Sequence, residues 1–322
     1  MSTNLLKHVL LAALCLFSFA LQAQTYPSQT IKIVVGFSPG GVPDIAARIL
    51  GQQMTERWQQ AVLVENKLGA GSNIAAQAVA SATPDGYTLL SISSAFAISP
   101  AIYTSLPFDP LKDFAGVSLT ATGPAFLLVS PNLNVNNMKE LIDYAMKNPG
   151  KVTYSSAGVG SGSHFAAELI QAKAGVSLLH IPTKGIPDAI TEVMSGRVDF
   201  FISPYASAIN LVRAGKVRAI AVTSTKRVKD FPALPTVSES GIPGYKWEFW
   251  YGLLAPSKTP KPILQKISAE VKRILELPSV KERFDELGTT AVSSTPEQLD
   301  HLIATEIVAF AKLAKASGIK PE

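Results

Sequence analysis

Three glycine-rich turns that also carry serine or asparagine side chains stand directly before helix-forming segments of the sequence. They span Ser38 to Asp44, Gly69 to Asn73 and Gly158 to Ser163. A helix N-terminus offers unpaired N–H groups and the positive end of the helix dipole, which together suit a carboxylate. Glycine gives a ligand close access to the backbone, although a tight turn between strand and helix needs the same residues without any ligand. Three such turns favour an anion site, because open α/β sheets bind ligands at the edge where these turns collect.

Four polar side chains near these turns have both a structural and a ligand-binding interpretation. Asp44 either caps the helix after the first turn or holds a water or a ligand amine. His164 caps or lines the third turn, and Lys184, which lies in a turn before another helix, is solvated or reaches the ligand. Asp199 enters an apolar strand, which indicates either a hydrogen-bonded structural role or a place in the pocket.

One segment resembles a catalytic motif. Gly36 to Gly40 (GFSPG) matches the G-x-S-x-G nucleophile elbow of α/β-hydrolases, with Ser38 as the nucleophile. In that elbow the residue after the serine donates a backbone N–H to the oxyanion, but here that residue is Pro39, which has no N–H. A serine hydrolase using Ser38 is therefore the weaker alternative, and we predict no catalytic residue.

Metal, nucleotide and thiol chemistry have no matching motif. The segment Gly158 to Ser163 ends in serine where the dinucleotide fingerprint has glycine, and the sequence contains no P-loop. Cys15 is the one cysteine, which rules out a pair of thiolate ligands. The histidines beyond the N-terminal region have no metal-ligand spacing; they are His164, His180 and His301. We predict neither a metal nor a cofactor.

The elements that carry these turns alternate between strand and helix. Short β-branched runs predict strands, and apolar residues at helical spacing predict helices. This alternation predicts βαβ units and parallel sheets covered by helices, that is, an α/β fold. The expected strands cover residues 30–35, 61–65, 86–92, 126–130, 152–155, 177–181, 198–202, 217–223 and 251–255, and the expected helices cover residues 45–60, 74–81, 138–148, 164–174, 188–195, 262–275 and 297–316.

The length of 322 residues predicts two globular lobes. No sharp linker occurs, so we expect two crossing segments, near residues 120–124 and 223–235. Residues 24–122 and 226–322 then form lobe 1, and residues 123–225 form lobe 2. An apolar content of 47% is ample for two packed cores and excludes a disordered protein.

The first 23 residues have the pattern of a secretion signal. Lys7 supplies a positive charge, Val9 to Ala20 form an apolar stretch too short to span a membrane, and Ala23 is a small residue at a plausible cleavage point. We therefore expect export to the periplasm with cleavage near Ala23. Lipidation of Cys15 is an alternative, although Leu14 stands before it where a small residue is usual.

The charge pattern gives no support to nucleic-acid binding. The net charge is +5, and the lysines and arginines are scattered rather than clustered. An excess of this size favours anionic solutes only slightly.

An ordered series of motifs resembles the Bug or TctC family, the extracytoplasmic solute receptors of tripartite tricarboxylate transporters. The series runs through nearly the whole chain after residue 23. It consists of residues 37–44 (FSPGGVPD), 65–75 (ENKLGAGSNIA), 84–90 (PDGYTLL), 154–164 (YSSAGVGSGSH), 215–224 (GKVRAIAVTS), 234–244 (LPTVSESGIPG) and 250–260 (WYGLLAPSKTP).

The resemblance implies a type II periplasmic-binding-protein fold, in which two α/β lobes joined by a two-segment hinge close on a ligand cleft. It implies that a loop of each lobe clamps one carboxylate. Here these loops are Phe37 to Asp44 and Ser156 to His164. The expected ligand-binding residues are Phe37, Ser38, Gly40, Gly41, Asp44, Ser156, Gly160, Ser161, Ser163 and His164, with Asn73, Lys184 and Asp199 as additions.

The first loop departs from the family pattern, which has small or hydroxyl residues between the glycines and the aspartate. Val42-Pro43 removes a hydroxyl and one N–H donor. The identity of the ligand is thus undecided among a dicarboxylate, a tricarboxylate, an aromatic carboxylate and a neutral relative such as nicotinamide. The implied partner is a tripartite inner-membrane permease that receives the ligand, and we expect the receptor to be a monomer. A sensor that docks on a signalling protein would have the same sequence features.

Overall fold

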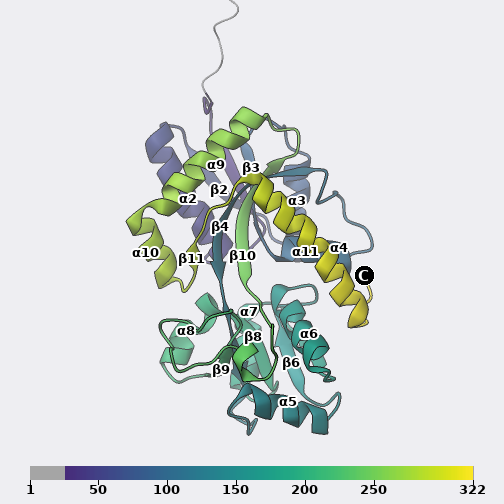
Figure 1. Cartoon of the computed structure of the whole chain (residues 1–322). Helices are drawn as coiled ribbons and strands as arrows, with labels where there is room; N and C mark the ends of the chain where they lie inside the picture. Colours follow the sequence, from purple (N-terminus) through teal and green to yellow (C-terminus); the bar gives the residue numbers. More distant parts are fainter. Residues whose placement is uncertain (1–25, 322) are drawn as a thin grey trace, which may run out of the picture.

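The computed structural model describes residues 26–321, which fold around two β-sheets (Figure 1). The predicted signal segment, with Lys7, Cys15 and Ala23, lies outside the described residues. Within residues 26–321, no helix has the length and apolar character needed to cross a membrane. The two sheets and their helices form the two α/β lobes that the sequence predicts.

Lobe 1 contains a six-stranded sheet. Its three parallel strands come first in the chain, and the apolar residues of β1 and β3 are buried because helices cover both faces, whereas the edge strand β2 is only partly covered. In sheet order the strands are β11 (Thr290–Ala291), β4 (Phe114–Gly123), β10 (Phe249–Pro256), β3 (Thr88–Ser93), β1 (Ile31–Val35) and β2 (Val62–Asn66).

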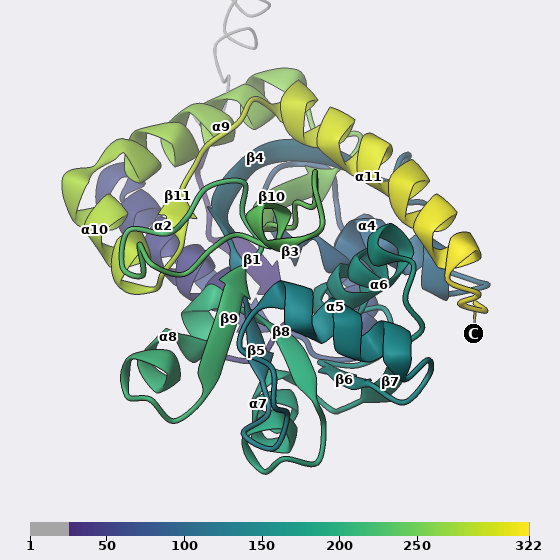
Figure 2. The same cartoon turned by 60° about the horizontal axis from the view of Figure 1, so that its bottom comes forward.

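The helices of lobe 1 come from both ends of the chain. Figure 2 shows α9 and α11 lying across this lobe. The C-terminal part of α11 reaches lobe 2, where it contacts α6. The start of α11 is fixed by a capping box between Thr295 and Gln298. The helices are α2 (Val42–Trp58), α3 (Asn73–Ala80), α4 (Ala95–Ile102), α9 (Lys261–Glu276), α10 (Pro278–Glu286) and α11 (Pro296–Ala316), with a 3₁₀ turn, η2 (Ala70–Ser72), before α3.

Lobe 2 contains a five-stranded sheet with helices on both faces. In sheet order its strands are β7 (Leu179–Pro182), β6 (Thr153–Ser156), β8 (Phe200–Pro204), β5 (Ala125–Val129) and β9 (Arg218–Val222). Its helices are α5 (Met138–Lys147), α6 (Gly162–Ala174), α7 (Ile186–Met194) and α8 (Tyr205–Arg213), and a 3₁₀ turn, η3 (Ser238–Ser240), follows β9.

Several elements were not predicted. Strand β4 carries glycine, serine, threonine and alanine, which make a weak strand signal, but β10 and β11 pair with it on both sides. Helix α4 is apolar on every side and contains Pro100, so its sequence has no helical periodicity. Tertiary packing, rather than local pattern, therefore determines these two elements.

The chain crosses between the lobes at Gly123-Pro124 and again just before β10. Residues 226–246 were expected in lobe 1, but their contacts are with lobe 2. Thr236 bridges to Val222 of β9, and the Tyr245 hydroxyl donates to the Ala166 carbonyl of α6 at 2.9 Å. We therefore propose a division in which the second crossing lies near Trp247, later than the sequence suggested.

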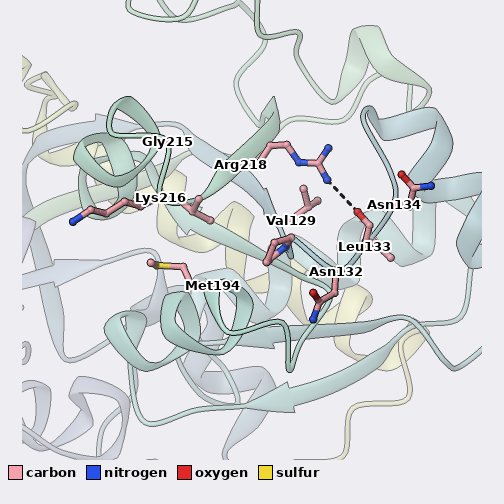
Figure 3. Close-up of a pocket in the computed structure, with 10 residues that line it drawn as sticks. Val129, Asn132, Leu133, Asn134, Met194, Gly215, Lys216 and Arg218 are labelled. Atoms are coloured by element: carbon pink, nitrogen blue, oxygen red, sulfur yellow. Dashed lines mark hydrogen bonds between the residues drawn. The ribbon is translucent and has the colours of Figure 1, made fainter.

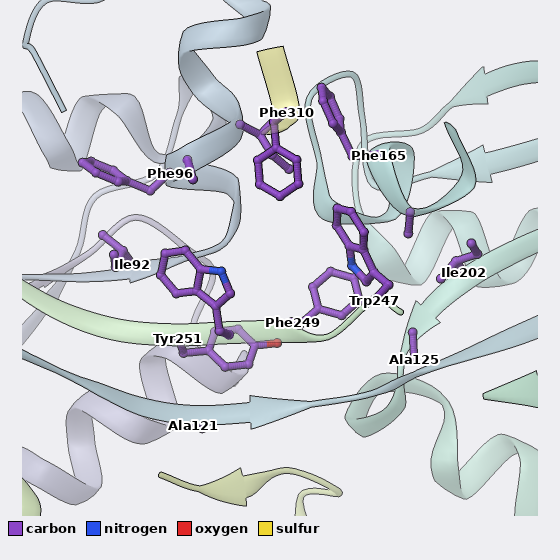
Figure 4. Close-up of a cluster of buried hydrophobic side chains, with 14 of the residues drawn as sticks. Ile92, Phe96, Ala121, Ala125, Phe165, Ile202, Trp247, Phe249, Tyr251 and Phe310 are labelled. Atoms are coloured by element: carbon purple, nitrogen blue, oxygen red, sulfur yellow. The ribbon is translucent and has the colours of Figure 1, made fainter. Parts of the chain in front are cut away.

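A cluster of aromatic side chains joins the two lobes beside this second crossing (Figure 4). The Phe165 ring of α6 and the Trp247 ring each lie 5.6 Å from the Phe310 ring of α11, centroid to centroid. Trp247 also contacts Phe249 at 6.3 Å. All four side chains are buried in one continuous apolar core. The lobes are therefore packed together on the side of α11.

Candidate functional site

The first and third glycine-rich turns lie on facing edges of the two sheets. Strand β10 runs antiparallel to β3 and begins at the lobe crossing, so the carboxyl ends of β1 and β3 lie at the edge of lobe 1 that faces lobe 2. In lobe 2, Ala125 just after the crossing pairs with Pro204 at the end of β8, and β6 is parallel to β8. The loops that follow β1 and β6 therefore face each other.

The loop after β1 is fixed by the buried carboxylate of Asp44. This carboxylate accepts hydrogen bonds from the Gly40 N–H at 2.9 Å, from the Arg48 Nε at 3.0 Å and from the Asn66 Nδ2 at 2.8 Å. The same Asn66 amide also donates to the Phe37 carbonyl at 3.0 Å. Burial alone would raise the pKa of Asp44, but these hydrogen bonds lower it below its usual value. Asp44 is thus an ionised anchor of the loop.

At the tip of this loop both glycine N–H groups are engaged, because the Gly40 N–H donates to Asp44 and the Gly41 N–H donates to the Ser38 carbonyl at 3.3 Å. Ser38, Pro39 and Gly40 are exposed, and within residues 26–321 the Ser38 hydroxyl makes no hydrogen bond to a histidine or carboxylate that would activate it as a nucleophile. The loop leads into α2, whose first N–H groups have no partner inside the helix. Pro43 removes one of them, as expected.

The loop after β6 is held by serine hydroxyls. Ser161 is the N-cap of α6: its Oγ accepts from the His164 N–H at 3.3 Å and donates to the Gly158 carbonyl at 2.7 Å. The Ser163 hydroxyl accepts from the Ala157 N–H at 3.0 Å. With these hydroxyls and the His164 N–H engaged, the groups left for an anion in the first turn of α6 are the backbone N–H groups of Gly162 and Ser163.

Two stacked histidine rings form hydrogen bonds with residues of this loop. The His164 and His180 rings lie 4.0 Å apart, centroid to centroid. His164 Nδ1 accepts from the Gly160 N–H at 3.2 Å, which makes its imidazole the Nε2–H tautomer, and His180 Nε2 lies 2.6 Å from the Ser156 hydroxyl. Burial lowers the pKa of His164 to about 4, and burial together with the neighbouring His164 lowers the pKa of His180 to about 3. Both rings are therefore neutral at neutral pH.

Acid is expected to destabilise the protein through this pair. Because both pKa values lie below the ordinary value of about 6.5, the folded state binds fewer protons than the unfolded state in mild acid. This part of the stability is complete above about pH 6.5 and is lost as the pH falls through 4. Urea unfolding of a His164→Gln/His180→Gln variant should show a weaker loss between pH 6.5 and 4 than the wild type. The control variant His301→Gln, at an exposed position, should lose as much free energy of unfolding between pH 6.5 and 4 as the wild type does. A His164→Gln/His180→Gln variant that lost equally much would contradict the assignment of this acid sensitivity to the two histidines.

The loop after β6 also contacts lobe 1. A Cβ atom placed on Gly160 would lie 3.0 Å from the Ile102 Cγ1 at the end of α4, and one on Gly162 would lie 2.5 Å from the Phe249 ring of β10. Glycine is therefore required at both positions for the close approach, and Gly160 in addition has a φ of +75°. These contacts place the N-terminus of α6 against lobe 1.

The three additional residues have different positions. Asn73 begins α3 and accepts a hydrogen bond from the Ser99 hydroxyl of α4 at 3.1 Å, near the facing edge of lobe 1. Lys184 is exposed in the loop after β7, beside the loop after β6. Asp199 precedes β8 at the opposite edge of the sheet, where its carboxylate accepts from the Thr153 N–H at 2.8 Å. For Asp199 the structure favours the structural alternative.

Sequence reasoning missed several residues that shape this region. Arg48 and Asn66 hold the Asp44 carboxylate, His180 stacks behind the loop after β6, and Ile102 meets Gly160 from the other lobe. Each belongs to a different element from the group that it contacts, except Arg48. Arg48 lies four residues after Asp44, a spacing that places both on one helix face and could have been recognised.

A cavity of about 400 Å³ lies elsewhere in lobe 2 (Figure 3), at the sheet edge opposite the lobe crossing, as the pairing of β5 with β8 and β9 shows. It adjoins the end of β5 and the start of β9, and Arg218 at its wall donates to the Leu133 carbonyl at 3.1 Å. None of the predicted site residues lines it. We therefore place the candidate site at the facing loops and not in this cavity.

Comparison with known proteins identifies the family of the chain. Residues 46–319 match the family described as the tripartite tricarboxylate transporter family receptor, TctC. The chain belongs to the TctC family. The protein BugT of Bordetella pertussis (strain Tohama I) is 33% identical over 300 residues, which are 92% of each chain. The resemblance to the Bug and TctC receptors is thereby confirmed.

Two similar solved structures, both of proteins from Rhodopseudomonas palustris, contain small carboxylates. Rpa4515 with adipate has a TM-score of 0.84 and 31% identity, covering 92% of this chain and 100% of that one. MatC with bound malate has a TM-score of 0.78 and 32% identity, covering 89% and 99%. The family consists of periplasmic solute-binding receptors, so the predicted fold is confirmed and carboxylate binding is established for these relatives.

Proposed function

We propose that this TctC-family chain is a periplasmic receptor that binds a small organic carboxylate between the loop at residues 37–44 and the loop at residues 156–164. It then delivers the ligand to a tripartite inner-membrane permease. The observation that carries this proposal is the position of these loops: each precedes a helix N-terminus, and the two lie on facing sheet edges. Two helix N-termini directed to one space favour an anion.

The relatives narrow the ligand class. Rpa4515 was solved with adipate and MatC with malate, both small dicarboxylates. We infer that the ligand of this chain is a di-, tri- or aromatic carboxylate of similar size. In this proposal the receptor binds its ligand without catalysing a reaction. A ligand that contacts both lobes shifts the population toward the closed arrangement, and the permease then recognises that arrangement. The signal pattern in residues 1–23 supports export, and we expect the receptor to act as a monomer.

A thermal-shift panel tests this proposal. The chain from residue 24 is stripped of ligand by unfolding and refolding, and is then melted with dicarboxylates, tricarboxylates, aromatic carboxylates and nicotinamide. At a hundredfold excess over the dissociation constant, a specific ligand should add about 2.7 kcal/mol to the free energy of unfolding. We expect at least one carboxylate to raise the melting temperature selectively, whereas no shift with any carboxylate would contradict the proposal.

Two variants that each remove a helix N-cap test whether the ligand-induced rise in melting temperature depends on the loop at residues 156–164. Ser161→Ala removes the N-cap of α6, and Thr295→Ala removes the N-cap of α11 far from the loop. Each is expected to cost about 1 kcal/mol of stability. Only Ser161→Ala should also abolish the ligand-induced shift, and equal shifts in the two variants would argue against binding at this loop.

A further inference from the structure

Ser94 stands where the chain leaves β3 and enters α4, at the edge of lobe 1 that faces lobe 2. The parallel neighbours β1 and β3 continue to opposite sides of the sheet, because β1 leads to β2 on one side and β3 leads to β4 on the other. The crevice between two such strands is where open α/β sheets bind ligands. Ser94 therefore lies at this crevice, next to the loop after β1.

The hydroxyl of Ser94 has no protein partner although it is buried. The residue is 2% exposed, and its Oγ makes no hydrogen bond within the described part of the chain. Its backbone is fully fixed, because its N–H donates to the Trp250 carbonyl at 3.0 Å and its own carbonyl accepts from the Ala97 N–H at 3.2 Å. A buried hydroxyl in a native protein is normally paired with protein, water or ligand.

Three other buried side-chain atoms of the described residues also lack a hydrogen-bond partner. Among residues 26–321 these are the Trp247 Nε1 in the aromatic cluster, the Thr259 Oγ1 in the turn after β10 and the Ser317 Oγ after α11. Strand β10 runs antiparallel to β3, so Thr259 lies at the opposite edge of the sheet. Thr259 thus offers a control for the loss of an unpaired buried hydroxyl outside the site.

Helix α4 connects Ser94 to the rest of the candidate site. Its Ser99 hydroxyl donates to the Asn73 Oδ1, and its last residue, Ile102, meets Gly160 of lobe 2. The start of α4 adds a positive dipole end beside the free hydroxyl, although the Ala95 N–H already donates to the Ser93 Oγ at 3.3 Å and the Ala97 N–H to the Ser94 carbonyl. A second anionic group of a ligand would find charge-assisted hydrogen bonds there.

From these observations we infer that Ser94 and the first turn of α4 bind the second carboxylate of a dicarboxylate whose first carboxylate lies between the loops at residues 37–44 and 156–164. This inference rests on the proposed function and narrows it: Ser94 distinguishes dicarboxylates from monocarboxylates of the same chain length. Because the hydroxyl has no protein partner, its removal leaves no other group unsatisfied.

Calorimetric titration of matched ligands tests the role of Ser94. The probes are succinate with butyrate and adipate with hexanoate, measured on wild type, Ser94→Ala and Thr259→Val. Of succinate and adipate, we expect the one that binds the wild type more tightly to bind at least tenfold more tightly than the monocarboxylate of the same chain length. Ser94→Ala should weaken the dicarboxylate about tenfold, as for a hydrogen bond to a charged group, and should leave the monocarboxylate and the melting temperature of the free protein unchanged. Thr259→Val should bind all four as the wild type does.

The outcomes separate this inference from the proposed function. A wild type that binds these dicarboxylates no better than the monocarboxylates, or a Ser94→Ala variant that binds them as the wild type does, would overturn the role of Ser94 alone. The ligand-free Ser94→Ala variant could instead show a lower melting temperature together with equally weaker binding of dicarboxylates and monocarboxylates. That result would give Ser94 a structural role and would also overturn its role in binding the second carboxylate. A wild type that binds no carboxylate at all in the thermal panel would instead remove the proposed function, and the inference with it.

Discussion

Replacement of Asp44 by alanine is expected to lower the free energy of unfolding by about 3 kcal/mol, because it removes the carboxylate that ties the loop after β1 to α2 and β2. The Arg48 guanidinium, the Asn66 amide and the Gly40 N–H would each lose a partner. Urea denaturation at pH 7 measures this loss, and ligand affinity should fall with it because the loop is no longer fixed. Asp44→Asn, which keeps the shape without the charge, should lose less.

Glu65→Ala is the matched control for this change. Glu65 also forms ion pairs, with Lys32 at 2.9 Å and with Lys67 at 3.3 Å, but its side chain is 38% exposed whereas that of Asp44 is 2% exposed. An exposed ion pair contributes at most about 1 kcal/mol. If Asp44→Ala were no more destabilising than Glu65→Ala, Asp44 would not be the anchor of the loop.

The second large effect is expected from Gly160→Ala, which should weaken carboxylate binding at least tenfold. The new methyl group would press on Ile102 of lobe 1 and the alanine would have to adopt a φ of +75°, so the loop after β6 and the N-terminus of α6 would shift. A displacement of this kind costs affinity because the helix N–H groups no longer point at the carboxylate. Calorimetric titration with the carboxylate that ranks first in the thermal panel measures the change.

Gly175→Ala separates backbone strain from the interlobe contact. Gly175 ends α6 with a φ of +65°, and a Cβ atom added there would meet nothing within 4 Å, so this variant adds only the strain of a left-handed residue, about 1–2 kcal/mol. It should lose stability and keep its affinity. Ile102→Ala in the Gly160→Ala background should recover part of the binding, and unchanged affinity in Gly160→Ala itself would contradict the contact.

The parts of the fold that local pattern determines were predictable. Strand β1 was expected at residues 30–35 and spans Ile31–Val35, and α6 was expected at residues 164–174 and spans Gly162–Ala174. Both follow from periodicity and from the glycine turns. The lobe assignment of residues 226–246 was not accessible in this way, because it depends on the bridge between Val222 and Thr236 and on the packing of Tyr245 against α6.

The candidate site was predicted as two loops and not as a set of contacts. The glycine-rich turns at residues 38–44 and 158–163 were recognised from their composition, the family resemblance extended them to residues 37–44 and 156–164, and the parallel strands bring them to facing edges. The role of Ser94 had no sequence signal, because a serine before a helix normally acts as a cap and only the structure leaves its hydroxyl unpaired. Asp199 precedes its strand, which places it at the far edge of the sheet, and the structure therefore favours the structural one of its two predicted roles.

The central claim is that a carboxylate binds between the two loops, and a crystal structure with the best carboxylate from the thermal panel tests it most directly. We expect one carboxylate between the loop at residues 37–44 and the first turn of α6, with the Ser38 hydroxyl and the N–H groups of Gly162 and Ser163 within hydrogen-bond distance. A ligand found instead in the 400 Å³ cavity beside Arg218 at the far end of lobe 2 would contradict the claim.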